Sequence, residues 1–279
     1  MKYRTVKTKG KELYQLVFDK SPFYAESGGQ AGDSGQIVSE SGETVNILNT
    51  IKENNLNIHL ADRIPVDKNV TFHASVDGLK REETAANHTA THLLHFALRQ
   101  ILGTHIEQKG SSVTSGSFRF DFSHFEKISE EHLREVEKLV NKLIRQDIHK
   151  EEHRELPIDQ AREMGAMALF GEKYGDKVRV IKYGDSVELC GGTHATSTGR
   201  IGSFKIVSES AVAAGVRRIE AITGRHVENA VYFMEDQIKS IRQLLGNAPD
   251  AIKGLMKVLA ENDTQKKALQ EVALERILN

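Results

Sequence analysis

The sequence predicts an α+β fold in three parts. These are a small N-terminal β-barrel-like domain over residues 1–78, an antiparallel sheet with long helices on one face over residues 79–225, and a helical hairpin or coiled-coil segment over residues 226–279. The first part has short apolar runs between glycine clusters, the second mixes strand-like and helix-like periods, and the third is helical throughout. Because strands and helices do not alternate regularly, an α+β arrangement is favoured over a doubly wound sheet.

Short β-type segments fill residues 1–78. Apolar runs at 14–18, 45–51 and 70–74 are separated by polar stretches rich in glycine and asparagine. The densest of these stretches, Ser-Gly-Gly-Gln-Ala-Gly-Asp-Ser-Gly, covers residues 27–35. This spacing suits a small barrel with glycine turns between its strands.

A helix is expected over residues 82–102. At about 100° per residue, His88, His92, His95 and Arg99 fall on one side of this helix, and its apolar residues fall on the other. The histidines therefore form a polar stripe opposite the buried face.

The rest of the second part is expected to hold one more long helix and five strands. The helix begins after Ser129, a plausible N-cap, and closes at Leu156-Pro157. Its buried stripe consists of Leu133, Val136, Val140, Leu143 and Ile144. The strands are expected at 117–122, 178–181, 186–190, 204–207 and 216–222.

The last part repeats apolar residues at steps of four and three. The repeating residues are Val227, Val231, Met234, Ile238, Ile241 and Leu245, and a second helical stretch follows residues 246–249. We expect a helical hairpin or the start of a coiled coil, with self-association as its role. The helix reaches Asn279 without a C-cap, which is expected of a chain that continues in a longer protein.

Composition excludes several classes of protein. The single cysteine cannot form an intramolecular disulfide, which indicates a reducing compartment, and no run approaches ~18 consecutive apolar residues. A signal-peptide core is also absent, so a cytoplasmic protein without membrane contact is expected. With 38 Lys and Arg against 39 Asp and Glu, a bulk electrostatic nucleic-acid or DNA binder is not expected.

Four side chains suggest a metal site. His88 and His92 are one helical turn apart among small and apolar neighbours, and Cys190-Gly-Gly-Thr-His194 sets a thiol and an imidazole on a glycine turn after a strand. Together they form a Cys-His₃ set, whose soft and borderline donors suit Zn²⁺. The alternative is a structural buried cysteine beside an unrelated histidine pair.

Several segments closely resemble the editing region of bacterial alanyl-tRNA synthetase. The matching segments are HTATHLLHFALRQILGTHIEQKGS, SFRFDFSHF, GDSVELCGGTHATSTGRIGSFKIVSES, GVRRIEAITG and, nearer the N-terminus, FYAESGGQAGDSGQI. The resemblance covers about residues 13–246, in order and spacing, and extends to free-standing alanyl-tRNA editing proteins. It implies that His88, His92, Cys190 and His194 bind zinc, and that Gln108 belongs to the substrate pocket.

The resemblance also implies a reaction, the hydrolysis of seryl- and glycyl-tRNA(Ala). A synthetase pocket shaped for alanine cannot strongly reject serine or glycine, so a second site must hydrolyse the wrong ester. The candidates for bonding the serine hydroxyl are Gln108, Thr91 and Thr193, although each threonine could instead bond its own backbone. Aminoacylation and ATP binding belong to the full-length synthetase and are not expected of this segment.

Two roles for zinc remain open. An ion held by three side chains could activate a water molecule, whereas an ion held by all four would shape the pocket or bind substrate after one ligand detaches. The rival to an enzyme is a noncatalytic tRNA-binding and oligomerisation module, which would not need the Cys-His₃ set.

Two shorter motifs point to other enzymes and are set aside. The Gly28-Gly29-Gln30 tripeptide matches peptide release factors but lacks the basic residues that follow it there. The pair His149 and His153 fits the zinc-peptidase pattern H-x-x-E-H, but we expect it on the solvated face of a helix.

Contact with tRNA must come from local cations because the net charge is −1. Arg217 and Arg218 are the first candidates, and a strand sends these neighbours to opposite faces. Ion pairs with Glu209 or Glu220 are the alternative role. A second cationic cluster consists of Lys173, Lys177, Arg179 and Lys182.

Overall fold

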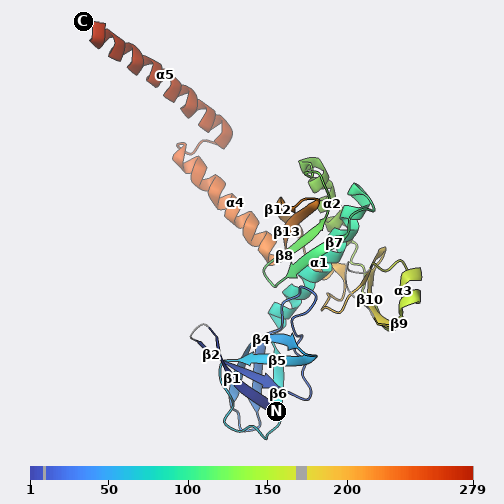
Figure 1. Cartoon of the computed structure of the whole chain (residues 1–279). Helices are drawn as coiled ribbons and strands as arrows, with labels where there is room; N and C mark the ends of the chain where they lie inside the picture. Colours follow the sequence, from blue (N-terminus) through green and yellow to red (C-terminus); the bar gives the residue numbers. More distant parts are fainter. Residues whose placement is uncertain (9–10, 168–174, 279) are drawn as a thin grey trace. The chain divides into compact units, whose positions relative to one another are not determined.

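The protein is described by a computed structural model that covers residues 1–8, 11–167 and 175–278. It divides into two compact units, Met1–Val227 and Glu228–Asn279. Three antiparallel sheets and the helices between them form the first unit, so the predicted α+β class is confirmed (Figure 1). None of the helices in the described part of the chain is both long and apolar enough to cross a membrane.

The N-terminal sheet has six strands in the order β1-β2-β5-β4-β3-β6. They are β1 (Lys2–Thr8), β2 (Lys11–Val17), β3 (Gly35–Ser39), β4 (Thr44–Glu53), β5 (Leu56–Ala61) and β6 (Phe72–Val76). Leu16, Ile37, Val45 and Ile47 form the centre of its core. In this order β1 and β6 lie at opposite ends, so the sheet formed by the described residues does not close into the expected barrel. Among the described residues β1 pairs with β2 alone, and most of its side chains are exposed to solvent.

The second sheet has the order β12-β13-β8-β7. Its strands are β7 (Gln108–Val113), β8 (Phe118–Ser123), β12 (Phe204–Ala213) and β13 (Val216–Thr223). Helices α1 (Gly78–Leu102) and α2 (Glu130–Arg145) pack against each other and against this sheet, burying Phe118, Phe120 and Phe122. The expectation of long helices on a sheet is met here, and this packing holds α1, which carries the histidines, in place.

Helix α2 begins as expected but ends early. Ser129 caps it by accepting a hydrogen bond from the backbone N–H of His132 at 3.1 Å. The helix stops at Arg145, and the predicted continuation to Leu156-Pro157 is wrong. Asp147 adopts a left-handed conformation (φ 48°), and the following residues form β9 (Glu151–Pro157). Pairing of β9 with β10 outweighs local helix propensity there.

The third sheet has the order β11-β10-β9 and lies beside α1. It contains β10 (Lys177–Tyr183) and β11 (Ser186–Leu189), and the short helix α3 (Ile158–Glu163) covers it. A 3₁₀ turn, η1 (Thr198–Ile201), follows the loop that leaves β11. All five strands expected in this part of the sequence are present, but they belong to two sheets instead of one.

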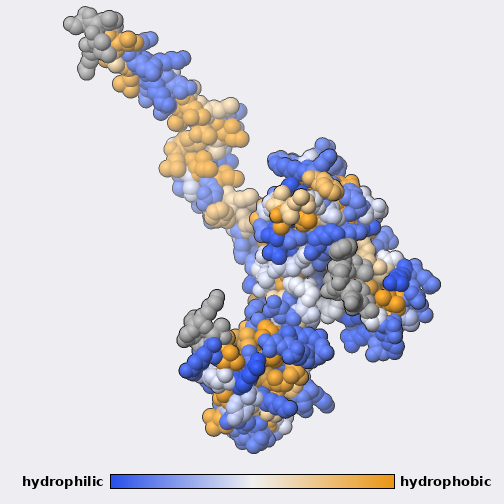
Figure 2. All heavy atoms as spheres, viewed as in Figure 1, coloured by the Kyte–Doolittle hydropathy of each residue, from blue (hydrophilic) through white to orange (hydrophobic). Residues whose placement is uncertain are grey.

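The second unit is helical, as the apolar repeat predicts. Helix α4 (Arg225–Leu244) leads into it, and α5 (Ala251–Leu278) follows. Figure 1 draws α5 after the end of α4 and not folded back along it, so of the two expected arrangements the hairpin is not seen, while the start of a coiled coil stays a prediction. Many apolar side chains of both helices are exposed, and the space-filling view shows them as orange patches along this unit (Figure 2).

Candidate metal centre

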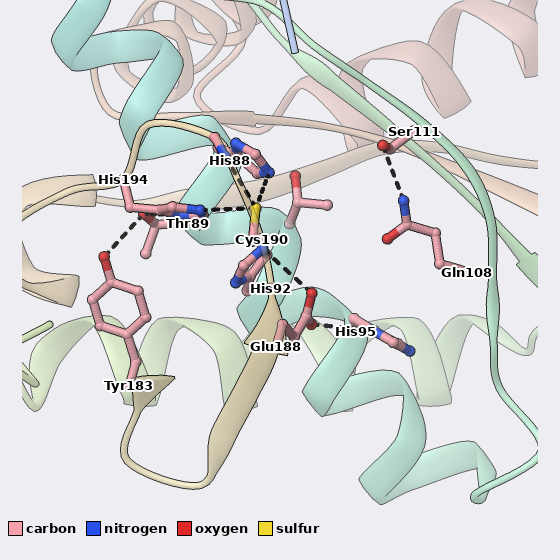
Figure 3. A network of polar contacts seen from close by, with 12 residues as sticks. His88, Thr89, His92, His95, Gln108, Ser111, Tyr183, Glu188, Cys190 and His194 are labelled. Carbon is pink, nitrogen blue, oxygen red and sulfur yellow. Dashed lines mark hydrogen bonds and ion pairs between the residues drawn. The ribbon is translucent and has the colours of Figure 1, made fainter. Parts of the chain in front are cut away.

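Two elements bring the four predicted donors together. His88 and His92 project from one face of α1, and Cys190 and His194 belong to the loop after β11 (Figure 3). One potential ligand atom from each residue lies within 4.8 Å of the other three. Within the residues that the structure describes, this is the one cluster of three or more such side chains suited to a metal.

The distances suit a tetrahedral ion. Sγ of Cys190 lies 3.4 Å from Nε2 of His88 and 3.2 Å from Nε2 of His194. Zinc bonds of about 2.0 Å to nitrogen and 2.3 Å to sulfur, at a tetrahedral angle, would place nitrogen about 3.5 Å from sulfur. Nδ1 of His92 is buried and has no partner among the described residues, which also fits a site that takes a ligand. The cluster is therefore compatible with zinc.

Burial keeps these imidazoles neutral. Burial, followed by the proximity of His92, lowers the pKa of His88 to about 3. Burial likewise lowers the pKa of His92, and it holds the pKa of His194 well below its ordinary value. A neutral imidazole keeps the lone pair that a metal requires.

The histidine face of α1 is not open to solvent. His88, His92 and His95 are all buried, as are the apolar residues on the opposite side, so the centre of the helix is enclosed all round. The sequence placed the histidines correctly on one stripe but did not show what covers them. The cover is the third sheet and the 190–194 loop.

Glu188 is a buried carboxylate beside the cluster that the sequence analysis missed. Its oxygens lie 3.3 Å from Nε2 of His92 and 3.1 Å from Nδ1 of His95. Burial opposes its charge, but the two histidines outweigh burial and hold the pKa of Glu188 at about 2. The sequence did carry one signal for Glu188, because a charged residue stands two positions before Cys190, between apolar neighbours in a strand segment.

A second set of polar groups contacts His194 and its neighbour Ala195, on the Nδ1 side of the imidazole ring. Nδ1 of His194 lies 3.3 Å from the hydroxyl of Thr89, which also accepts from the backbone N–H of Ala195 at 3.0 Å. The hydroxyl of Tyr183 donates to the carbonyl of Ala195. These contacts fix the end of the loop against α1.

Arg179 fixes the beginning of the same loop. Its Nη1 donates to the carbonyl oxygens of Cys190 and Gly192 at 2.8 and 2.7 Å, and its Nε donates to Glu152 at 2.9 Å. This residue was predicted as a phosphate contact, yet its nitrogens hold the metal loop. Of its predicted companions, Lys177 pairs with Glu155, Lys182 pairs with Glu151, and Lys173 lies outside the described residues.

Gln30 reaches the cluster from the glycine-rich N-terminal segment. Gly28 and Gly29 have positive φ angles of 57° and 80°, which confirms the expected glycine turn. The fully buried Gln30 side chain lies 2.7 Å from Nδ1 of His88 and also contacts Thr193. The sequence analysis assigned these glycines to a turn and missed the glutamine.

A pocket of about 340 Å³ opens beside the cluster. His88, His92 and Cys190 line it together with Gln108 and Thr91, two of the three predicted substrate contacts. Gln108 donates to Ser111 at 3.1 Å, and Figure 3 shows its amide oxygen turned towards the metal donors. The hydroxyl of Thr91 donates to the backbone of its own helix at 2.8 Å.

Thr193, the third predicted contact, is not in this pocket. Its hydroxyl accepts from Nε2 of Gln30 at 2.9 Å, on the other side of the loop. Proximity in sequence to the metal ligands was therefore a poor guide to its direction.

The remaining predicted residues lie elsewhere. Arg217 pairs with Glu209, and Arg218 forms two hydrogen bonds of 2.7 and 2.8 Å with Asp121, so both engage carboxylates. His149 and His153 are not on a helix, because the chain there is extended. At about 3.3 Å per residue they are too far apart to share one ion.

Comparison with known families agrees with this geometry. Residues 178–220, which contain Cys190 and His194, match the family described as the threonyl and alanyl tRNA synthetase second additional domain. Residues 1–79 match the family of class II (A) tRNA synthetases. Two stretches of the chain are thus similar to domains of tRNA synthetases.

Three relatives of the chain are all synthetases of one kind. The chain is 54% identical over 278 residues to an alanine–tRNA ligase of Porphyromonas gingivalis and 53% identical over 276 residues to one of Bacteroides fragilis. The alanine–tRNA ligase of Cytophaga hutchinsonii is 52% identical over 278 residues. Each match covers 99–100% of this chain and 32% of the relative. Over its whole length the chain is similar to these alanine–tRNA ligases, and it spans about a third of their length.

Proposed function

We propose that this chain hydrolyses the ester bond of seryl- and glycyl-tRNA(Ala) and spares alanyl-tRNA(Ala). The observation that carries this proposal is the shared pocket: three of the four metal donors and Gln108 line the same cavity. A metal and a hydrogen-bonding amide in one pocket suit a small polar substrate that is both bound and cleaved.

Selectivity follows from the cost of an unpaired buried polar group. A seryl ester can donate its hydroxyl hydrogen to the amide oxygen of Gln108, whose nitrogen already donates to Ser111. An alanyl ester offers no such group and would leave that oxygen without a partner, at a cost of about 1–3 kcal/mol. Glycine lacks the hydroxyl as well, so we expect its ester to be cleaved more weakly than the seryl ester. The contact with Gln108 separates serine from both smaller residues, and the cleavage of the glycyl but not the alanyl ester is proposed from the resemblance to the editing region.

The chain's own residues hold the reaction centre in place. A zinc ion bound by His88, His92, Cys190 and His194 would shape the pocket, and it would supply Lewis-acid chemistry to an ester once one of these ligands had detached. Arg179 and Thr89 fix the two ends of the loop that carries Cys190 and His194. Glu188 sets the position of His92 and His95 through its two oxygens.

Phosphate contact is supported by a cationic basin of about 780 Å³ across the loop from the pocket. The basin is lined by five cationic side chains, Arg81, Lys150, Arg154, Lys177 and Arg179, and by the carboxylates of Glu152 and Glu155. The whole chain, in contrast, carries a net charge of −1. We include this basin among the proposed contacts of the tRNA backbone, together with the Arg217 and Arg218 pair, of which Arg218 is the more exposed.

Self-association through α4 is a further part of the proposal. No residue of α4 is buried, and Val231, Met234, Ile238 and Ile241 are 41–50% exposed on it. Sedimentation of the chain at several concentrations tests this. A monomer at every concentration would remove self-association from the proposal.

The direct test of the function is deacylation of three purified esters of the same tRNA. The seryl ester should be hydrolysed fastest, the glycyl ester more slowly and the alanyl ester no faster than without protein. Gln108→Ala should lose the preference for the seryl ester, whereas Gln36→Ala, an exposed glutamine on β3, should keep it. Equal hydrolysis of the seryl and alanyl esters by the unaltered chain would contradict the proposal.

A further inference from the structure

The side chain of Gln30 joins three parts of the chain at one point. It comes from the glycine turn of the N-terminal segment, has no solvent exposure, and contacts both α1 and the 190–194 loop. Gln30 lies outside the family match of residues 178–220 and inside the match of residues 1–79. Its polar groups are all within hydrogen-bond distance of named partners.

The orientation of its amide follows from an unambiguous donor. The backbone N–H of Thr193 can only donate, and it lies 2.8 Å from Oε1 of Gln30, so this atom is the carbonyl oxygen. The amide nitrogen then donates to the hydroxyl of Thr193 at 2.9 Å. No other assignment of the amide satisfies both contacts.

This orientation decides the tautomer of His88. The same Oε1 atom lies 2.7 Å from Nδ1 of His88, so Nδ1 must carry the hydrogen in order to donate to it. Nε2, which lies 3.4 Å from Sγ of Cys190, is then the nitrogen with the free lone pair. In metal sites, the partner of the second imidazole nitrogen usually sets ring orientation in this way.

The turn that carries Gln30 is itself fixed by backbone bonds to β7. The N–H of Ala31 donates to the carbonyl of Val113 at 2.9 Å, and the N–H of Val113 donates to the carbonyl of Gly29 at 2.8 Å. A Cβ atom on Gly29 would overlap the backbone of Ser111, and one on Gly192 would overlap His88 and Gln30. Glycine is therefore required on both sides of the contact.

We infer that Gln30 is a positioning residue of the metal centre. This inference rests on the proposed metal site. Gln30 presents Nε2 of His88 to the ion and ties the loop carrying Cys190 and His194 to the helix carrying His88 and His92. The N-terminal segment thus completes the centre, although all four donors lie outside it.

Three variants separate this role from simple packing. Gln30→Met keeps the length of the side chain and removes both polar groups. Gln30→Glu keeps the acceptor for His88 and Thr193, and the Thr193 hydroxyl can donate to it. Gln36→Met is the matched control, because Gln36 is exposed on β3.

The readout is zinc affinity, measured by competition with a chelator, together with the absorption spectrum of the cobalt-substituted protein. Gln30→Met should weaken zinc binding by about 10- to 100-fold and alter the cobalt spectrum, as loss of such partners does elsewhere. Gln30→Glu and Gln36→Met should stay within about threefold of the unaltered chain.

Three results would overturn the inference, and failure of the Gln30 role can be told apart from failure of the metal site. If Gln30→Met binds zinc as tightly as the unaltered chain, Gln30 does not position His88, while the proposed function stands. If the unaltered chain binds no zinc, the metal site fails and the inference fails with it. If Gln30→Met does not fold, Gln30→Ser replaces it, because the serine side chain is too short to reach His88. Normal zinc affinity in Gln30→Ser would then overturn the inference.

Discussion

The guanidinium of Arg179 donates to Glu152 at 2.9 Å while it also holds the carbonyl oxygens of Cys190 and Gly192. With Arg154 and Lys150 alongside it, Arg179 keeps the pKa of Glu152 far below its usual range. One ion pair on the edge of the third sheet thereby fixes the start of the metal-binding loop.

Arg179→Gln should destabilise this loop without removing a metal ligand. Hydrogen bonds from a charged donor contribute about 1.5–3 kcal/mol each, but bonds in one network are not additive, so we expect a loss of about 2–4 kcal/mol of unfolding free energy in urea. Arg154→Gln is the control, because Arg154 contacts the same carboxylate but its side chain is 79% exposed. That variant should lose less than about 1 kcal/mol. Equal losses in the two variants would contradict the loop-holding role.

Cys190→Ala should lose zinc and His149→Ala should keep it. Of these two residues, Cys190 belongs to the four-donor cluster, whereas His149 is exposed and lies on extended chain. Metal analysis of protein purified without added zinc measures this directly. About one zinc per chain is expected in His149→Ala, and a folded Cys190→Ala protein with the same content would count against the site.

The metal-free protein should lose stability as the pH falls below about 6.5. The pKa of His88 is about 3 in the folded state, and those of His92 and His194 are also lowered, so the unfolded chain binds protons first. Unfolding free energy should be unaffected by these groups above pH 6.5. Below it, the decrease should approach about 1.4 kcal/mol per pH unit from His88 alone, and His92 and His194 should add to it with the same sign. Urea unfolding with a chelator at pH 7.5, 6.5 and 5.5 measures the slope, and a flat profile would contradict the burial of neutral imidazoles.

Arg218→Ala should weaken tRNA binding and lower the log-log salt dependence by about one. Its side chain is 27% exposed, whereas that of Arg217 is 11% exposed against Glu209, so Arg217→Ala should act mainly on stability. Filter binding across a series of salt concentrations distinguishes the two. An unchanged slope in both variants would assign the pair to structure and move the contact to Arg154 and Lys177.

Sequence periodicity predicted what depends on local spacing. The His88 and His92 pair, the Ser129 cap and the Cys190–His194 turn all follow from chemistry within five residues, and the structure contains each of them. Contacts between segments that are distant in the sequence could not be predicted from local spacing. Gln30 meets His88 and Thr193 across 58 and 163 residues, and β9 replaces the end of a helix because β10 pairs with it. Nothing in the neighbouring sequence encodes those partners.

The central claim is a metal-dependent hydrolysis of the wrong ester, and one titration tests it most directly. Zinc is added stepwise to metal-free, folded protein, and bound zinc and seryl-tRNA(Ala) hydrolysis are measured in the same samples. We predict that hydrolysis rises in proportion to bound zinc and levels off at one ion per chain. Full hydrolysis by the folded, metal-free protein, or none with one zinc bound and saturating seryl-tRNA(Ala), would contradict the account.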